Sequence, residues 1–377
     1  MDRRDFIRVL GGGAIFAAAG CAPAGTADPR SAWTNPGAGE TDIRRKALSW
    51  AILAPNPHNM QPWVVDLSTP DEIALYIDRT RLLPVTDPFN RQIVIGCGAF
   101  LELLTMALAE QGAGAETSLF PDGEAHPRLD GRPLFRLRLG GGAARAPLFA
   151  SAPARRTYRG PFTDQVVDAS MAANLLGAFR PTPGADCNVT VAPDRVERLR
   201  GLVYRGAEIE AHTPPAHRES VERTFIGARA VAEHPWGISL DAPAMTAMNA
   251  LGVLTKEKMA TPGTTAFKEA LKFLKTAADT SRGFLWIATA TDSRAEQMAA
   301  GRAYLLANLA AARFGLAMHP WSQGLQEYAT QKPVYDALHR ELAPGGGRIQ
   351  MLARFGFPKA AVPPAPRRGL AAQLRAV

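Results

Sequence analysis

Two apolar segments, roughly two hundred residues apart, share one pattern. Residues 98–112 and residues 301–315 are nearly all apolar, and each begins and ends with glycine. A helix that is apolar on every side is buried, and glycine just past the last turn is the usual carboxyl-terminal cap. Both segments are therefore predicted to be buried helices.

The sequence around these two helices repeats as well. Each helix follows a plausible strand and a charged turn, and each precedes small residues and another strand candidate. This pattern indicates a tandem duplication, and the Gly/Ala stretch 140–144 marks the boundary near residue 145. We expect a first half over residues 41–145 and a second half over 146–377. Fusing two copies of a dimeric unit gives a single-chain pseudodimer, which we expect to be monomeric.

The second half is the longer one because it contains an apparent insertion. Residues of about 205–282 are mostly polar helical sequence interrupted by Pro214, Pro215 and Gly237. A segment of this size beside a site is often a functional cover. We therefore interpret it as an insertion and as a possible lid.

The amino terminus has the features of an export signal. Charged residues 2–8 precede a mildly apolar stretch, 9–20, which is too short to span a bilayer. Arg3 and Arg4 followed by Phe6 resemble the twin-arginine signal, so residues 1–21 are predicted to direct export to the periplasm. That route carries folded proteins, often with a cofactor already bound.

Residues 18–21 also resemble a lipoprotein cleavage box, in which Cys21 would be lipidated and would anchor the chain to the membrane. A larger aliphatic residue is usual three positions before that cysteine, so anchored and soluble periplasmic forms both stay open. Residues 22–40, rich in Ala, Gly, Pro and Thr, are predicted to be a flexible tether.

Charge and cysteine spacing argue against several classes of function. The formal charge of +8 comes mainly from arginines scattered through mixed-sign sequence, which argues against a nucleic-acid partner. Cys21, Cys97 and Cys187 have neither zinc-ligand nor disulfide-framework spacing. The planar guanidinium fork binds phosphate in a bidentate manner, so arginine clusters remain candidates for phosphate binding.

A proline-rich loop carries the most specific motif. Residues 54–63 read Ala-Pro-Asn-Pro-His-Asn-Met-Gln-Pro-Trp, and the prolines prevent the preceding helix, 41–53, from continuing. The segment resembles the loop that lies along the flavin in the nitroreductase family, with Asn56 in place of the usual Ser. The resemblance implies that Asn56, Asn59 and Gln61 contact the cofactor; a buried loop with self-capping amides is the alternative.

Arginine motifs open and close the second half. Residues 155–162 read Arg-Arg-Thr-Tyr-Arg-Gly-Pro-Phe and resemble the start of nitroreductases, where such residues bind the phosphate and the pyrimidine edge of FMN. The resemblance assigns that role to the following four residues: Arg155, Arg156, Thr157 and Arg159. Arg367 and Arg368 resemble the basic pair with which the family returns to the same phosphate, although basic tails also occur without a ligand.

Two further segments also resemble parts of the family. Gln323 and Gly324 resemble the family turn that offers a backbone N–H to flavin N5, with Gln in place of Glu. His319 is interpreted as a packed residue rather than a proton donor. Residues 78–91 resemble the fused, Acg-type branch of the family, and structural ion pairs are favoured there over ligand contacts.

The resemblance implies a nitroreductase-like α+β fold, in which two fused halves form central antiparallel or mixed sheets flanked by helices. A two-fold dimer of this family has two flavin sites. Here the loop is intact in the first half and the arginine motif in the second, whereas residues 181–188 are a degraded counterpart. We therefore expect one FMN per chain.

The resemblance also implies a function: an FMN-dependent oxidoreductase with ping-pong hydride transfer through flavin N5. Its partners would be small molecules, with NAD(P)H as donor and a nitroaromatic, a quinone or a similar acceptor. Because nicotinamides are scarce outside the cytoplasm, another donor stays open. The alternative is a protein that binds and stores FMN without turnover.

Overall fold

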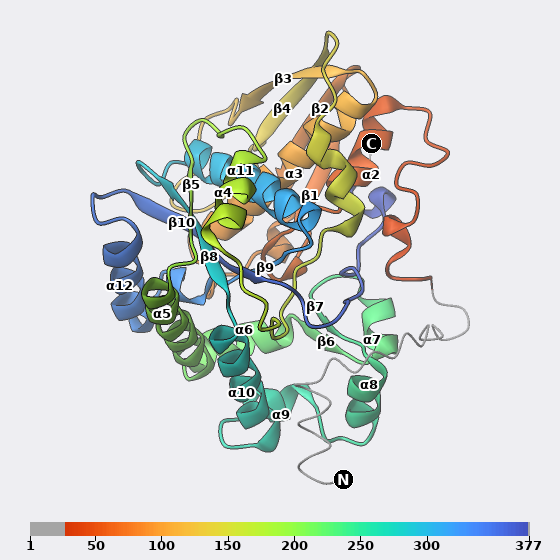
Figure 1. The fold of residues 1–377 in the computed structure, drawn as a ribbon. Coiled ribbons are helices and arrows are strands. Elements are labelled where there is room, and N and C mark those ends of the chain that lie inside the picture. Colours follow the sequence, from red (N-terminus) through yellow and green to blue (C-terminus); the bar gives the residue numbers. More distant parts are fainter. Residues whose placement is uncertain (1–26, 376–377) are drawn as a thin grey trace.

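The computed structural model describes residues 27–375, which contain two four-stranded antiparallel sheets (Figure 1). The first sheet consists of β1 (Trp63–Asp66), β2 (Glu72–Ile77), β3 (Gly114–Leu119) and β4 (Phe135–Gly140). The second consists of β5 (Asp186–Thr190), β8 (Gly283–Thr289), β9 (Ala317–Pro320) and β10 (Arg348–Gly356). The predicted α+β class is confirmed.

The two sheets have the same connectivity. Their strand orders are β1-β2-β4-β3 and β5-β8-β10-β9, so each strand has a counterpart in the same place. A helix precedes the first strand of each sheet: α2 (Ile43–Ala51) in the first and α4 (Ala169–Gly177) in the second. A long helix follows the second strand of each sheet, α3 (Arg91–Glu110) and α11 (Arg294–Arg313). This correspondence is the one that a tandem duplication produces.

Helices α3 and α11 cross at the centre of the molecule (Figure 1). They contain the two apolar segments, and most of their residues are buried in one shared core. At the crossing, a Cβ on Gly98 would collide with the Met298 carbonyl oxygen, and a Cβ on Gly301 would collide with that of Ile95. The backbones therefore touch, and only glycine fits at either position. α3 is apolar and long enough to cross a membrane, but it is a core helix here.

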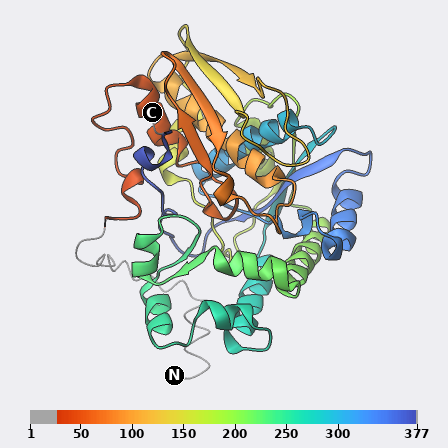
Figure 2. The ribbon, with the colours of Figure 1, turned by 180° about the vertical axis from the view of Figure 1, so that it is seen from behind.

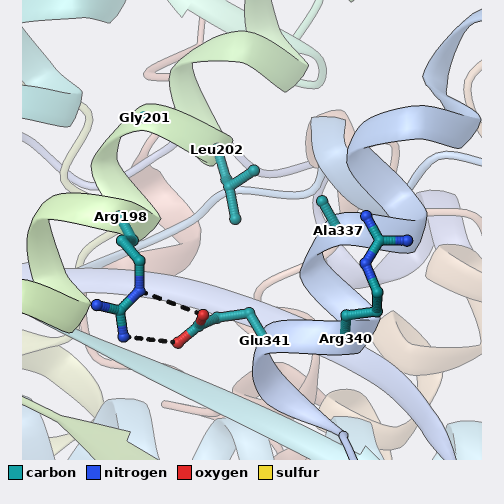
Figure 3. Close-up of a pocket in the computed structure, with 6 residues that line it drawn as sticks. All are labelled: Arg198, Gly201, Leu202, Ala337, Arg340 and Glu341. Atoms are coloured by element: carbon teal, nitrogen blue, oxygen red, sulfur yellow. Dashed lines mark hydrogen bonds and ion pairs between the residues drawn. The ribbon is translucent and has the colours of Figure 1, made fainter.

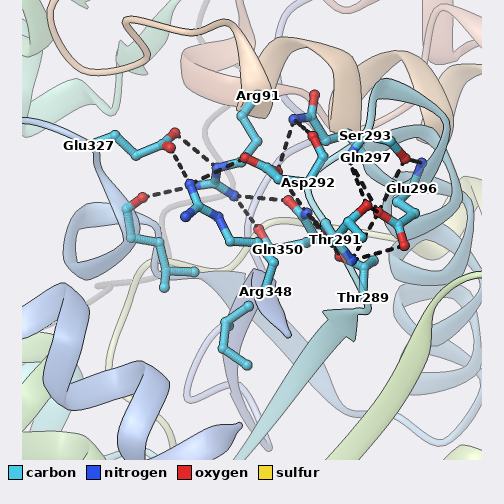
Figure 4. A network of polar contacts seen from close by, with 12 residues as sticks. Arg91, Thr289, Thr291, Asp292, Ser293, Glu296, Gln297, Glu327, Arg348 and Gln350 are labelled. Atoms are coloured by element: carbon cyan, nitrogen blue, oxygen red, sulfur yellow. Dashed lines mark hydrogen bonds and ion pairs between the residues drawn. The ribbon is translucent and has the colours of Figure 1, made fainter. Parts of the chain in front are cut away.

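Two equivalent buried arginines extend this contact between the halves. Arg91, the first residue of α3, donates to the carbonyls of Gln350 (2.8 Å) and Leu325 (2.7 Å) and pairs with Glu327 at 3.1 Å. Figure 4 shows this network beside the first turn of α11. The structural ion pair favoured for residues 78–91 is thus present at Arg91, inside the protein.

Arg294, the first residue of α11, mirrors Arg91. Its Nε donates to the Ala125 carbonyl at 3.1 Å, and its Nη2 donates to that of Pro127 at 3.0 Å. Glu124 accepts from the Arg294 backbone N–H at 3.0 Å. Each long helix therefore begins with an arginine that binds carbonyl groups of the opposite half. Because both side chains are only 1% exposed, these hydrogen bonds are shielded from water.

The two halves differ in the segment that connects their first two strands. β1 and β2 are joined by residues 67–71, whereas β5 and β8 are separated by residues 191–282. That segment contains the predicted insertion 205–282. Its helices are α5 (Pro193–Ala211), α6 (Pro214–Glu222), α7 (Ala228–Glu233), α8 (Pro243–Ala250), α9 (Lys256–Ala260) and α10 (Thr265–Asp279). Two short parallel strands, β6 (Thr224–Ile226) and β7 (Ile238–Leu240), complete it. Figures 1 and 2 show most of it at the end opposite the first sheet.

The first described residues lie on the carboxyl-terminal segment. Arg30 donates to the Pro364 carbonyl at 2.8 Å and pairs with Asp241 of the insertion at 2.8 Å. The indole of Trp33 donates to the Ala365 carbonyl at 2.9 Å. The flexible tether predicted over 22–40 is corrected for its described part, because these contacts bind it to the body. The predicted signal 1–21 and Cys21 lie outside the described residues.

The glycine crossing generates a stability prediction. We expect Gly301→Ala to lower the free energy of unfolding by about 1–3 kcal/mol, because the added methyl forces the two helices apart. Gly201→Ala is the matched control: it lies inside α5 with open space around it, so it should stabilise by about 0.5–1 kcal/mol. Urea unfolding measures both. Equal effects of the two substitutions would contradict the close backbone contact.

Candidate functional site

The loop between α2 and β1 has a constrained backbone. His58, Asn59 and Gln61 all have positive φ, at 47°, 54° and 49°. Non-glycine residues seldom adopt this conformation, and clusters of it are typical of functional sites. Asn56 fixes the loop, since its Oδ1 accepts from the Gln61 backbone N–H at 2.8 Å. The sequence-predicted amides therefore form one rigid unit.

Arginines from the second half reach this loop. Arg367 donates to Asn59 Oδ1 at 2.6 Å and to the carbonyls of Ile52, Leu53 and Ala54 at 2.8 to 3.1 Å. Arg155 donates to the Leu53 carbonyl at 3.0 Å. These carbonyls end α2, where the helix dipole favours cations. The structure thus brings predicted residues from both ends of the chain together.

A tryptophan covers the same arginines. The guanidiniums of Arg155, Arg156 and Arg367 lie 5.7, 5.4 and 5.4 Å from the ring of Trp33. Arg156 also donates to the Val362 carbonyl at 3.3 Å, which links it to the tail. Such cation–π contacts stabilise a desolvated cation without neutralising it.

Of the other predicted residues near this cluster, Arg368 is bonded to the loop, whereas the side chains of Thr157 and Arg159 are not bonded to described residues. The Arg368 backbone N–H donates to Gln61 Oε1 at 2.8 Å, and its guanidinium donates to the Gln61 carbonyl at 3.3 Å. Thr157 forms an isolated bridge to β9 at Met318, and its hydroxyl has no hydrogen-bond partner within residues 27–375. Arg159 is exposed, and its guanidinium likewise has none within that range.

The positive charge of this cluster has no counterion among residues 27–375. Within residues 27–375, no carboxylate lies within ion-pair distance of any of the following five side chains: Arg155, Arg156, Arg159, Arg367 and Arg368. Burial lowers the pKa of Arg155 to about 10 and that of Arg367 well below its usual range. Because buried charges are normally paired, this cluster is suited to hold an anion.

Two neutral polar atoms face the same region without a partner. The Tyr304 hydroxyl and His58 Nδ1 are buried and form no hydrogen bond with any described residue. Burial raises the Tyr304 pKa, and the charges of Arg155 and Arg159 oppose this rise. Burial, and then the charges of Arg159 and Arg223, lower the His58 pKa to about 4, so its imidazole is neutral. Orphaned groups of this kind fit a polar ring system beside an anionic group.

Gln323 and Gly324 lie in a different environment. They form a 3₁₀ turn that packs between α5 and α12 (Lys332–Leu342). A Cβ on Gly206 of α5 would come within 2.8 Å of the Gly324 Cα, so the insertion closes tightly on this turn. The nearby Gln326 side chain donates to Glu210 of α5 at 2.6 Å. Their assignment to the flavin stays a prediction.

His319 is held by a buried arginine. Its Nδ1 accepts from Arg354 Nε at 3.2 Å, and its ring meets Trp321 edge-on. This environment agrees with a packed residue. Arg354 also donates to the carbonyls of Arg159 and Gly160, both at 2.8 Å, and thereby shapes the arginine motif.

Sequence reasoning did not select several residues of this region: Trp33, His58, Tyr304 and Arg354. Arg354 had a usable signal, because it is a charged residue inside a mostly apolar strand. Trp33 and Tyr304 had none, since their role depends on contacts across more than one hundred residues of chain.

A surface groove elsewhere is less suited to a cofactor. It lies between α5 and α12 and is lined by Arg198, Leu202, Arg340 and Glu341 (Figure 3). Arg198 and Glu341 form an ion pair across it at 3.3 Å, so these two charges already have partners.

Several known proteins similar to this chain have nitroreductase names. A Mycobacterium tuberculosis protein named provisionally as an NAD(P)H nitroreductase is 27% identical over 343 residues, or 88% of this chain and 90% of the relative. The provisional NAD(P)H nitroreductase acg of the same organism is 37% identical over 82 residues, 22% of this chain and 24% of its own. No family model matches the chain. These relatives support the resemblance to the nitroreductase family.

A nitroreductase-like family protein from Bacillus cereus has a TM-score of 0.36 and 13% identity, and the match covers 63% of this chain and 99% of that one. An FMN-dependent nitroreductase from Mycobacterium smegmatis, solved with NADPH, has a TM-score of 0.33 and 15% identity, over 59% and 94%.

Glu210, which joins the insertion to the 323–326 turn, generates a pH prediction. Burial raises its pKa from 4.5 to about 7. The folded state therefore keeps a proton that the unfolded state releases, so this contribution to stability is full below about pH 4.5 and disappears as pH rises through 7. Unfolding of the wild type and Glu210→Gln at pH 5 and pH 8 should show a relative gain of about 3 kcal/mol for the variant at the higher pH. Parallel pH profiles would contradict the raised pKa.

Proposed function

We propose that this chain is an FMN-dependent oxidoreductase of the nitroreductase type, with one cofactor between its two halves. The observation that carries the proposal is the arginine cluster, which has Arg155 and Arg367 buried beside the loop 54–62 and no carboxylate partner among the described residues. The full-length similarity to a provisionally named NAD(P)H nitroreductase supports the same function.

The side chains divide into two groups by chemistry. Arg156 and Thr157, with Arg155 behind them, would hold the phosphate, because guanidinium and hydroxyl groups satisfy its oxygens with charge-assisted bonds. Arg367 would contribute its charge alone, because all three guanidinium nitrogens already donate to protein oxygens. The loop 54–62 and Tyr304 would border the ring, with Arg159 available to stabilise negative charge. Bound FMN would supply hydride transfer between an electron donor and an acceptor. The protein needs no nucleophile for this chemistry.

Trp33 would seal the phosphate end of this site. Its ring covers three arginines, and its indole is fixed to the tail at Ala365. Excluding water there strengthens each charge interaction. The amino-terminal segment would therefore slow the release of the cofactor.

The phosphate assignment can be tested with two conservative variants. Arg156→Gln and Thr157→Val should each raise the Kd for FMN by about tenfold, because each removes one charge-assisted bond. Arg155 is not suited to this test, because its guanidinium holds the Leu53 carbonyl inside the protein. Fluorescence titration of the apoprotein measures the Kd, with Arg180→Gln at an exposed position as control. Unchanged affinity in both variants would remove the assignment.

Turnover separates an enzyme from a storage protein. Under anaerobic conditions, NADPH should bleach the flavin absorbance of the holoprotein, and menadione or a nitroaromatic should restore it over repeated cycles. If NADPH does not react, dithionite can replace it, since an exported enzyme can use another donor. A flavin that the acceptor fails to reoxidise after either treatment would contradict the enzymatic proposal.

A further inference from the structure

The tip of the insertion is attached to the loop 54–62. Asn59 and Gly237 form two hydrogen bonds: the Gly237 N–H donates to the Asn59 carbonyl at 3.0 Å, and Asn59 Nδ2 donates to the Gly237 carbonyl at 3.2 Å. Gln61 Nε2 donates to the Pro235 carbonyl at 2.9 Å. The same amides that were predicted to face the cofactor therefore hold the inserted segment in place.

Arg223 is positioned by this attachment. Its carbonyl accepts from the Ile238 N–H at 2.8 Å, immediately after Gly237, so its backbone lies one strand away from the loop. Its Nε is buried, and its side chain has neither a hydrogen bond nor an ion pair with the residues of 27–375. Arg223 is half-buried, and a buried Nε without an acceptor leaves one hydrogen bond that a ligand can complete.

Two further arginines donate to the same loop. Arg81 Nη1 donates to the Met60 carbonyl and Arg368 Nη1 to the Gln61 carbonyl, both at 3.3 Å. Arg81 has one counterion, Asp78, at 3.2 Å. Their surroundings thus carry an excess of positive charge.

An aromatic side chain borders this charge. The Arg81 guanidinium lies 4.9 Å from the ring centroid of Trp236, and Phe225 meets Trp236 edge-on. His58, whose Nδ1 is orphaned, lies close enough to Arg223 for that charge to lower its pKa. Neutral His58 can exchange a hydrogen bond with a ligand without adding charge.

We propose that the insertion gives this enzyme specificity for aromatic acceptors that carry a carboxylate, and that Arg223 is the residue that binds this carboxylate. The inference rests on the proposed function and names its substrate class. Arg223 acts through an ion pair with the substrate, with Trp236 beside the aromatic ring. The first half has only residues 67–71 in the equivalent place, so it has no counterpart of Arg223 and Trp236 there.

Binding measurements test the inference without requiring turnover. The probes are para-nitrobenzoate and para-nitrobenzamide, which have similar shapes and differ in charge, titrated calorimetrically into oxidised protein as purified. We expect para-nitrobenzoate to bind more tightly. Arg223→Leu should weaken its binding by about tenfold and leave para-nitrobenzamide unchanged, whereas Arg223→Lys should restore part of the loss. Arg229→Leu, an exposed arginine of the same segment, is the matched control.

The binding results that would overturn this inference differ from the result that would overturn the proposed function. Equal binding of both probes to the wild type, or an equal loss of both in Arg223→Leu, would overturn the inference. Loss of FMN from Arg223→Leu would assign the guanidinium to the cofactor, and weaker binding of NADPH alone would assign it to the donor's phosphates; both results would also overturn it. Failure of the proposed function would appear separately, as wild-type protein whose flavin no acceptor reoxidises.

Discussion

The close crossing of α3 and α11 is the constraint on which the remaining structure depends. Gly98 and Gly301 let the two backbones touch, and the two halves can meet in this orientation only because neither position carries a side chain. Arg91 and Arg294 then bind carbonyl groups across the junction from equivalent positions. The two sheets are thereby fixed relative to each other, and so are the loops and terminal segments that form the candidate site.

The candidate site is a consequence of that arrangement. The end of α2 belongs to the first half, whereas the arginines that bind its carbonyls come from the start and the tail of the second. Neither half alone contains both parts. Arg155 and Arg367 are buried there, and the cluster lacks carboxylate partners within the described part of the chain, so electrostatics point to an anionic ligand. The insertion is attached to the same loop through hydrogen bonds donated by Asn59 and Gln61.

Much of the fold could be predicted from the sequence, because it depends on local patterns. The two buried apolar helices and the rigid proline loop follow from composition, caps and turn residues, although each helix begins seven residues before the predicted glycine. The α+β class was predicted from the resemblance to the nitroreductase family. The ordered packing of residues 27–40 could not be predicted, since its Ala, Gly and Pro content is also that of a linker. What holds it is a set of hydrogen bonds to carbonyls more than three hundred residues away, at Pro364 and Ala365.

For the site, the sequence indicated which residues could bind a cofactor, but it did not indicate which side chains contact one another in the folded protein. The motifs around Asn59 and Arg155 identified which side chains could serve a phosphate or a flavin, but Trp33 and Tyr304 join them only through tertiary contacts. The central claim is that the two halves form a single cofactor site. It is tested most directly by releasing flavin from the purified, reconstituted holoprotein and measuring its amount and identity per chain. One FMN per chain is the predicted result, and two flavins, or none after reconstitution, would contradict it.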